Sequence, residues 1–472
     1  MLFNSFDFIL FLGAATVAFH YTPYSWRKYH LIIFSYLYYF SWSAGHALLL
    51  FGVSLTAYFT GLGVERAASE EGKKKSMALG VLLLAGVLFV FKYFNDFADF
   101  AAPGEGPVFY RILIPVGISY YTFRLISYVV DVYWGKITAE RDLAAFTAFA
   151  AFFPHILSGP IHRAETFLPQ LKKAGPVPYL MLTSGMRLIL FGFFKKLVIA
   201  DRLGIFVDTI YASPGNYNSL AILLAAYGFM IQLYADFSGL TDIARGSTRL
   251  LGFESPKNFD LPFYAPNIQQ YWRRWHMSLT QWLGDYVFMP LRMKFRNFGN
   301  TGLVLAILIN MTAIGLWHGA RTTYLAFGLL HGIYMIGSAL TLKRRDQFYK
   351  AHPLLARGRT LWGPLITFHL VILASIFFRA ESLSGAWEMI SGIAALDLSK
   401  AGPMFFAKRE ILILAVGGVI MEIVHYLESK GRIRGAYYSQ APWMRWAVLY
   451  GFTFFILGFG EFNSHNFIYF EF

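Results

Sequence analysis

Long apolar runs separated by short polar connections recur along this chain from one end to the other. A helix that spans a membrane needs about 20 predominantly apolar residues, and many of these runs approach that length. Only 14% of the 472 residues are charged, whereas soluble domains average about 25%. Because the chain lacks the polar residues to cover a soluble globule, we predict an all-α, polytopic integral membrane protein and exclude a soluble enzyme.

The apolar runs predict roughly ten to thirteen helices with no large soluble segment between them. The longest polar stretch, 254–274, is broken by prolines and aromatic residues, which favours a structured loop over a linker. No internal repeat is visible, so we predict one membrane-embedded domain, 1–472, with an aromatic tail at 461–472. The predicted runs lie at 5–22, 31–63, 76–97, 109–133, 142–158, 178–200, 218–237, 278–291, 301–317, 321–341, 360–378, 408–427 and 443–460.

Basic residues gather in pairs and triplets, which we place in loops between the apolar runs, and the net charge is +14. Such residues set the topology of membrane helices and attract anionic headgroups, so we expect lipid contacts and no nucleic-acid partner. The chain has no cysteine, which excludes disulfides, thiolate catalysis and cysteine-based zinc sites. The basic groups are Arg27, Lys28, Lys73, Lys74, Lys75, Lys172, Lys173, Lys195, Lys196, Lys343, Arg344 and Arg345.

Two carboxylates, Asp236 and Asp242, lie six residues apart where an apolar run ends, with Ser238 between them. Ionisable groups at membrane depth are costly and are frequently functional. A helix end turned toward water would explain these residues equally well. Two interpretations therefore stay open, an exposed helix end or one wall of a substrate tunnel.

A second cluster surrounds Arg273 and Arg274, which are flanked by Trp272 and Trp275. Tryptophan and arginine together are typical of a membrane interface, where both side chains reach the headgroups. An arginine pair beside a tunnel would also bind a phosphate or a carboxylate, so both arginines are candidate tunnel residues. The interface interpretation does not account for His276, which enters the next apolar run.

His318 follows Trp317 at the end of a nearly uncharged run and stands between Gly315 and Gly319. A histidine in a membrane helix often serves only as a hydrogen-bond donor to a neighbouring helix. The glycines favour a second interpretation, because we expect them to leave open space beside the imidazole. Imidazole is the natural general base near neutral pH, so His318 is a candidate catalytic residue. Its neighbour Trp317 is a candidate tunnel residue.

The spacing of the histidines argues against a metal site. His276, His318 and His331 are separated by 42 and 13 residues, and neither spacing is the i, i+4 pair of a helical metal site. The chain ends in an aromatic segment that contains Tyr469. That segment suits an aromatic anchor at the membrane interface, and it also suits a free tail that enters a cavity.

Taken together, these clusters resemble the membrane-bound O-acyltransferase family over nearly the whole chain. The resemblance is closest to bacterial members that O-acetylate an exported polysaccharide such as alginate. The matching stretches lie at 113–133, 153–160, 232–242, 271–279, 316–320, 377–380 and 467–470.

The resemblance implies a ring of helices around a thinned centre, crossed by a transmembrane tunnel. It implies that His318 is the catalytic histidine and that His276 is a second functional position. It also implies that a cytoplasmic donor meets an outer acceptor at His318. The terminal aromatic motif is similar to that of a small partner peptide in teichoic-acid D-alanylation, which singles out Tyr469 as an acyl-carrying residue.

Two departures leave the acyl group and the acceptor open. The residue before Asp285 is Gly284, where relatives usually carry arginine. The segment 290–296 is nearer to the D-alanylation members than to the alginate-type members, which tend to have a glycine-rich turn there.

The expected function is acyl transfer from a cytoplasmic thioester donor, expected to be acetyl-CoA, toward an exported polysaccharide. We expect no bound cofactor, a location in the bacterial inner membrane, and a second, periplasmic acyltransferase as partner. One alternative is D-alanyl or other acyl transfer from a carrier protein to a cell-envelope polymer or lipid. Others are a transporter or flippase, which moves substrate without covalent change, and a structural subunit, which would tolerate loss of His318.

Overall fold

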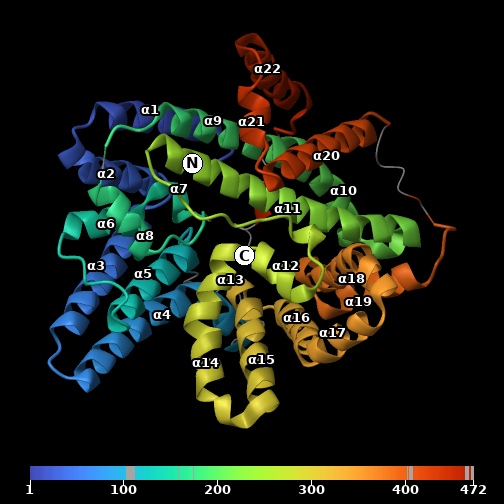
Figure 1. The fold of residues 1–472 in the computed structure, drawn as a ribbon, viewed down its shortest axis with the longest axis horizontal. Coiled ribbons are helices and arrows are strands. Elements are labelled where there is room, and N and C mark those ends of the chain that lie inside the picture. Colours follow the sequence, from blue (N-terminus) through green and yellow to red (C-terminus); the bar gives the residue numbers. More distant parts are fainter. Residues whose placement is uncertain are drawn as a thin grey trace. The chain divides into compact units, whose positions relative to one another are not determined.

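The computed structural model describes residues 1–101, 112–157, 159–173, 175–400, 402, 408–462 and 467–468. Every regular element within these ranges is a helix, which confirms the predicted all-helical fold (Figure 1). By its internal contacts the chain divides into two units, residues 1–189 with 240–256 and residues 190–239 with 257–472. The prediction of one domain over 1–472 stays a prediction.

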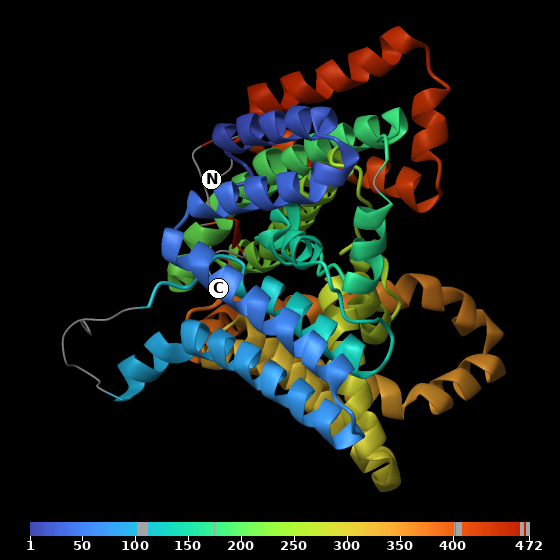
Figure 2. The same ribbon diagram turned by 90° about the vertical axis from the view of Figure 1, so that its left-hand side faces the viewer.

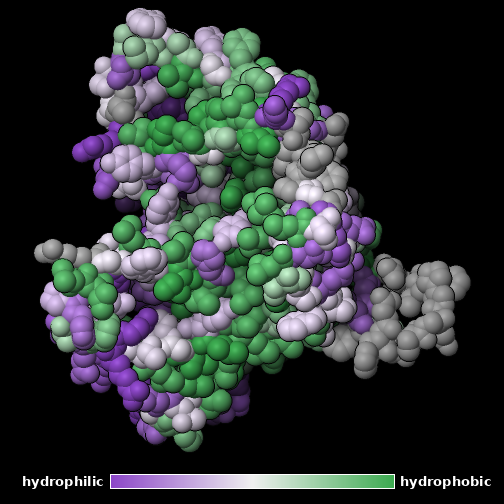
Figure 3. All heavy atoms as spheres, turned by 90° about the vertical axis from the view of Figure 1, so that its right-hand side faces the viewer, coloured by the Kyte–Doolittle hydropathy of each residue, from purple (hydrophilic) through white to green (hydrophobic). Residues whose placement is uncertain are grey.

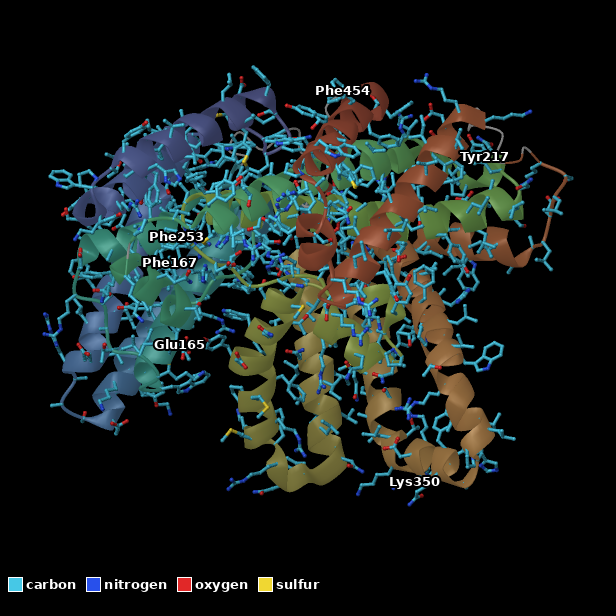
Figure 4. The ribbon with its side chains drawn as sticks, turned by 45° about the horizontal axis from the view of Figure 1, so that its top comes forward. Glu165, Phe167, Tyr217, Phe253, Lys350 and Phe454 are labelled. Carbon is cyan, nitrogen blue, oxygen red and sulfur yellow. The ribbon has the colours of Figure 1, made fainter. Side chains whose placement is uncertain are left out.

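The first unit contains the N-terminal helices. Helices α3 and α4 lie side by side within it (Figure 2). The ring of Phe167 in α8 stacks on that of Phe253 with a centroid distance of 5.1 Å (Figure 4). The elements are α1 Phe6–Tyr21, η1 Tyr24–Trp26, α2 Arg27–Phe40, α3 Ala44–Arg66, α4 Glu70–Ala101, α5 Ile118–Tyr133, α6 Leu143–Ala151, α7 Phe153–Ile156, α8 Ala164–Lys172 and, for the most part, α9 Tyr179–Phe193.

The second unit contains both candidate catalytic histidines. Helices α15 and α16 form its most extensive pair, and α16 also packs on α18. The elements are η2 Phe194–Ala200, α10 Asp201–Ala212, η3 Pro214–Asn216, η4 Pro262–Tyr264, α12 Ile268–Arg274, α13 Met277–Leu283, η5 Gly284–Phe288, α14 Met289–Lys294, η6 Arg296–Phe298, α15 Gly299–His318, α16 Thr322–Leu340, α17 Leu342–Ala351, α18 Pro353–Arg379, α19 Leu383–Ala394, α20 Lys408–Ser429, α21 Ile433–Tyr438 and α22 Pro442–Phe459. Helix α11, Ser219–Leu250, belongs to this unit up to Gly239 and to the first unit beyond it.

Among the described residues, seven helices are long and apolar enough to cross a membrane. Other predicted runs fold as shorter helices: 142–158 contains α6 and α7, and 278–291 contains most of α13, all of η5 and the first half of α14. Prolines begin or interrupt such pieces, as Pro154 does in α7 and Pro290 in α14. The candidate spans are Ala44–Arg66, Glu70–Asp96, Ser219–Leu250, Arg296–His318, Thr322–Leu340, Gly358–Arg379 and Lys408–Ser429.

Large apolar side chains are exposed on several helices of the second unit. Figure 3 shows broad hydrophobic areas on one face of the molecule, interrupted by smaller hydrophilic groups. Leu361 and Trp362 of α18 are exposed, as is Leu412 of α20, and Phe454 of α22 is 68% exposed. Soluble monomers rarely expose such patches, whereas lipid covers them in a multi-pass membrane protein.

Candidate active site

Helices α15 and α16 approach closely at two glycines. A Cβ atom at Gly315 would lie 2.4 Å from the carbonyl oxygen of Tyr324 and 3.4 Å from the Cα atom of Gly328. Small residues of this kind let two helix backbones touch. The prediction that Gly315 leaves open space beside an imidazole is therefore wrong, because α16 occupies that space.

His318 is the last residue of α15, directly after this crossing. Its ring is buried and meets two aromatic rings edge to face, those of Trp317 and Phe378, each with a centroid distance of 4.7 Å. Tyr324 and Phe327 of α16 add further ring contacts at 6.0 and 6.1 Å. The imidazole is thus held in an aromatic pocket whose position depends on the packing of α15 against α16.

His276 lies in the sharp turn between α12 and α13, with φ 43° and ψ 52°. A residue other than glycine rarely adopts this left-handed conformation, and where it does the surrounding structure must enforce it. Its carbonyl accepts from the N–H of Thr280 at 2.9 Å. His276 lies outside the seven candidate spans, and its side chain is buried. Burial lowers the pKa of His276 from 6.5 to about 3, so the imidazole is neutral at physiological pH.

A buried asparagine ties this turn to the preceding loop. Asn258 accepts the N–H of Met277 through its carbonyl at 2.9 Å. Its side-chain oxygen accepts from Ser278 twice, from the hydroxyl at 2.6 Å and from the backbone N–H at 3.3 Å. These bonds flank His276 on its C-terminal side and account for its unusual backbone angles.

His276 and His318 line one cavity in the second unit. The cavity has a volume of about 20 Å³, which is room for about one water molecule or a substrate hydroxyl. Trp317 contacts both imidazoles, with centroid distances of 5.7 Å to His276 and 4.7 Å to His318. Most of the remaining lining is apolar or aromatic, and it includes Tyr271, Trp272, Trp275, Phe327 and Phe378. The arrangement places two imidazoles around one small space, where a bound hydroxyl can meet a proton acceptor and a hydrogen-bond donor.

Comparison with known proteins decides the family. The sequence model of the membrane-bound O-acyltransferase family matches residues 140–378, just over half of the chain. The chain belongs to this family. Membership confirms the predicted acyltransferase class and removes support from the transporter and structural alternatives.

Three relatives have names that differ in the acyl group and the acceptor. The probable alginate O-acetylase AlgI of Pseudomonas aeruginosa is 35% identical over 82% of this chain and 74% of its own length. The peptidoglycan O-acetyltransferase of Helicobacter pylori is 29% identical over 78% of this chain and 74% of its own length. The teichoic acid D-alanyltransferase of Streptococcus thermophilus is 33% identical over 56% of this chain and 68% of its own length.

His331 lies apart from the two histidines of the cavity. Its Nδ1 atom accepts from the indole N–H of Trp272 at 3.3 Å, and its ring stacks on Tyr271 at 6.1 Å. These contacts give it a packing role between α12 and α16. The described ranges contain no group of three histidine, aspartate or glutamate side chains that would hold a metal ion. The prediction of no metal stays a prediction.

The candidate tunnel residues do not gather at the cavity. Asp236 and Ser238 are buried in α11, whereas Asp242 lies in the first unit, 3.6 Å from Arg245. Arg273 is exposed, and the carbonyl of Arg274 accepts from the N–H of Asp260 at 3.0 Å. None of these five is among the described lining residues, so their tunnel role stays a prediction. Tyr469 lies outside the described residues.

One buried charge cluster was not predicted from the sequence. Lys195 and Lys196 lie in the π-helix η2 and are buried, so their placement in a loop is wrong. The Lys196 ammonium is 2.8 Å from a carboxylate oxygen of Asp201 and 2.7 Å from one of Asp236. The available signal was their position inside the predicted run 178–200, where unneutralised charge is costly.

Proposed function

We propose that this membrane acyltransferase moves an acetyl group from acetyl-CoA to an acceptor hydroxyl, with His318 as general base. The observation that carries the proposal is the shared cavity of His318 and His276 in a chain of this family. The names of the AlgI and Helicobacter pylori relatives support acetyl as the acyl group.

The chemical step needs one base and one donor to the developing oxyanion. His318 removes the proton from the acceptor hydroxyl, whose oxygen attacks the thioester carbonyl carbon. The new C–O bond forms, the C–S bond breaks, and the proton passes from His318 to the departing thiolate, which leaves as the CoA thiol. Neutral His276 donates its N–H to the carbonyl oxygen as negative charge develops there. General-base catalysis of this kind is worth about 10²–10⁴ in rate.

We further propose that Tyr469 is the first acceptor. The acetyl group would then cross the membrane as a tyrosyl ester, and a second, periplasmic acyltransferase would move it to an exported polysaccharide. A polysaccharide acceptor is supported by the AlgI and Helicobacter pylori relatives, whose names refer to alginate and peptidoglycan. A bacterial inner-membrane location follows from this sequence of steps.

A second candidate is D-alanyl transfer from a carrier protein. It is favoured by the teichoic acid D-alanyltransferase of Streptococcus thermophilus, which is 33% identical over 281 residues. The two candidates share the histidine chemistry and differ in the donor.

Mass spectrometry of the C-terminal peptide tests the proposal. Purified protein is incubated with isotope-labelled acetyl-CoA, alongside Tyr469→Phe and His318→Ala. We expect labelled acetyl on Tyr469 in the parent and none in either variant. Label on added glycan or lipid but not on Tyr469 would discard the relay and keep the enzyme. Absence of any transfer from acetyl-CoA, with transfer from an acylated carrier protein, would favour the second candidate.

A further inference from the structure

A lysine and two aspartates form a fully buried charge cluster in the second unit. Lys196 is 1% exposed and Asp236 1%, while Asp201 is 4% exposed. Burying charges costs several kcal/mol each, and apolar side chains would usually pack such a space at lower cost. A second carboxylate beside one lysine leaves acceptor capacity that the ion pairs alone do not use.

The backbone near the end of the chain uses this remaining acceptor capacity of the aspartates. The backbone N–H of Ile468 donates to the second carboxylate oxygen of Asp236 at 3.0 Å. The ammonium of Lys196 lies 4.4 Å from the ring centroid of Phe467, which is buried. One cluster thus makes a charge-assisted hydrogen bond to the tail backbone and a cation–π contact to its aromatic side chain.

The π-helix η2 and the start of α10 also contact Phe459 and Glu461, shortly before Phe467. Within the π-helix η2, the carbonyl of Leu197 accepts from the N–H of Glu461 at 2.9 Å. The guanidinium of Arg202 donates to the carbonyl of Phe459 at 2.6 and 3.2 Å. π-Helical turns are rare and occur frequently at functional sites. The residues from η2 to the start of α10 therefore contact the end of the chain at several points.

Helix α11 connects this cluster with the candidate active site. Phe237 directly follows Asp236, and its ring meets that of His276 at 4.7 Å. Met230 and Leu233 of the same helix line the cavity of His276 and His318. A tail bound to Asp236 is therefore one residue of α11 away from a side chain that touches His276.

We propose that Lys196, Asp201 and Asp236 form a docking site, the tail seat, that binds Phe467 and Ile468 and positions the next residue, Tyr469, for acylation. The role rests on the proposed relay through Tyr469. Consecutive Cα atoms are about 3.8 Å apart, so fixing Ile468 restricts where the following residue can reach. Lys196 and Asp236 are positioning residues, because they act through the tail and not on the acyl group.

A proline substitution in the tail tests the seat without altering it. Ile468→Pro removes the N–H that Asp236 accepts, whereas Ile468→Ala keeps it and serves as the matched control. We expect Ile468→Pro to lower the initial rate of Tyr469 acetylation about tenfold, the usual effect of losing a hydrogen bond to a charged group. The change should fall on kcat and leave the KM for acetyl-CoA unaltered, because the donor does not touch the seat. Equal rates for the two variants would overturn the proposal.

A second pair of variants tests the seat from the other side. Asp236→Asn removes one buried charge and leaves Lys196 paired with Asp201. Asp208→Asn removes a partly exposed partner of Arg379 and is the control. Measured on folded protein, hydrogen exchange of the peptide that ends the chain should be faster in Asp236→Asn than in Asp208→Asn. Equal exchange would overturn the seat, whatever the acceptor is. Slow exchange in the parent without any label on Tyr469 would instead keep the docking and refute the relay.

Discussion

The glycine crossing that carries His318 predicts a measurable cost for one added methyl group. In Gly315→Ala the new Cβ atom would lie 2.4 Å from the carbonyl oxygen of Tyr324. A backbone carbonyl cannot rotate away as a flexible side chain can, so α15 or α16 must shift. Overpacking of this kind typically costs about 1–3 kcal/mol in free energy of unfolding.

Gly337→Ala on α16 is the matched control, because nothing lies within 4 Å of its added Cβ. Both substitutions gain the same helix propensity, about 1 kcal/mol, so their difference isolates the clash. We therefore expect Gly315→Ala to be less stable than Gly337→Ala by about 1–3 kcal/mol in a denaturant titration of the detergent-solubilised protein.

The same variant should lose activity, since His318 lies three residues beyond Gly315 on the same helix. A displacement of about 1 Å at a reacting group can cost about 100-fold in rate. Acetyl-CoA turnover by folded Gly315→Ala should therefore fall well below that of Gly337→Ala. Equal stability and equal turnover of the two variants would refute the assigned role of the crossing.

Two further predictions concern His276 and its support. The unfolded chain protonates His276 below about pH 6.5 and the folded chain only near pH 3, so stability falls as pH falls. His276→Asn tolerates the same backbone angles and is the reference. Relative to it, the parent should lose about 2 kcal/mol in free energy of unfolding between pH 7 and pH 5. The same pH dependence of the free energy of unfolding in both proteins would contradict this. Asn258→Ala should cost about 1–3 kcal/mol in free energy of unfolding and lower turnover, because the buried Ser278 loses both hydrogen bonds to the Asn258 side chain. Asn258→Asp keeps an acceptor and should retain more stability and more turnover. Equal losses of stability and turnover in the two Asn258 variants would contradict the role of these hydrogen bonds.

The membrane class and the candidate role of His318 were predictable from the sequence for physical reasons, whereas the role of His276 came from the family resemblance. Apolar runs of membrane length are rare in soluble proteins, and the family motifs around His276 and His318 singled out both residues. The resemblance implied a role for each residue and did not predict a shared cavity, which the structure shows beside Trp317.

Pairings between distant segments were not predictable. Gly315 packs against Gly328 across a turn, and a glycine beside a histidine suits free space and helix contact equally well. Lys196 pairs with Asp236, a carboxylate 40 residues away on α11, and the sequence alone does not show that partner. Helical periodicity reports which face of a helix is apolar and does not report which partner covers it.

Transfer of labelled acetyl from acetyl-CoA, followed as release of the CoA thiol, tests the central claim most directly when parent and His318→Ala are compared. His331→Gln is the control, because His331 lies outside the cavity and glutamine keeps an acceptor for Trp272. We expect His318→Ala to lose about 100-fold or more in rate while it unfolds as the parent does, and His331→Gln to stay near the parent. Transfer by folded His318→Ala at the parent rate would contradict the assignment of His318 as the general base.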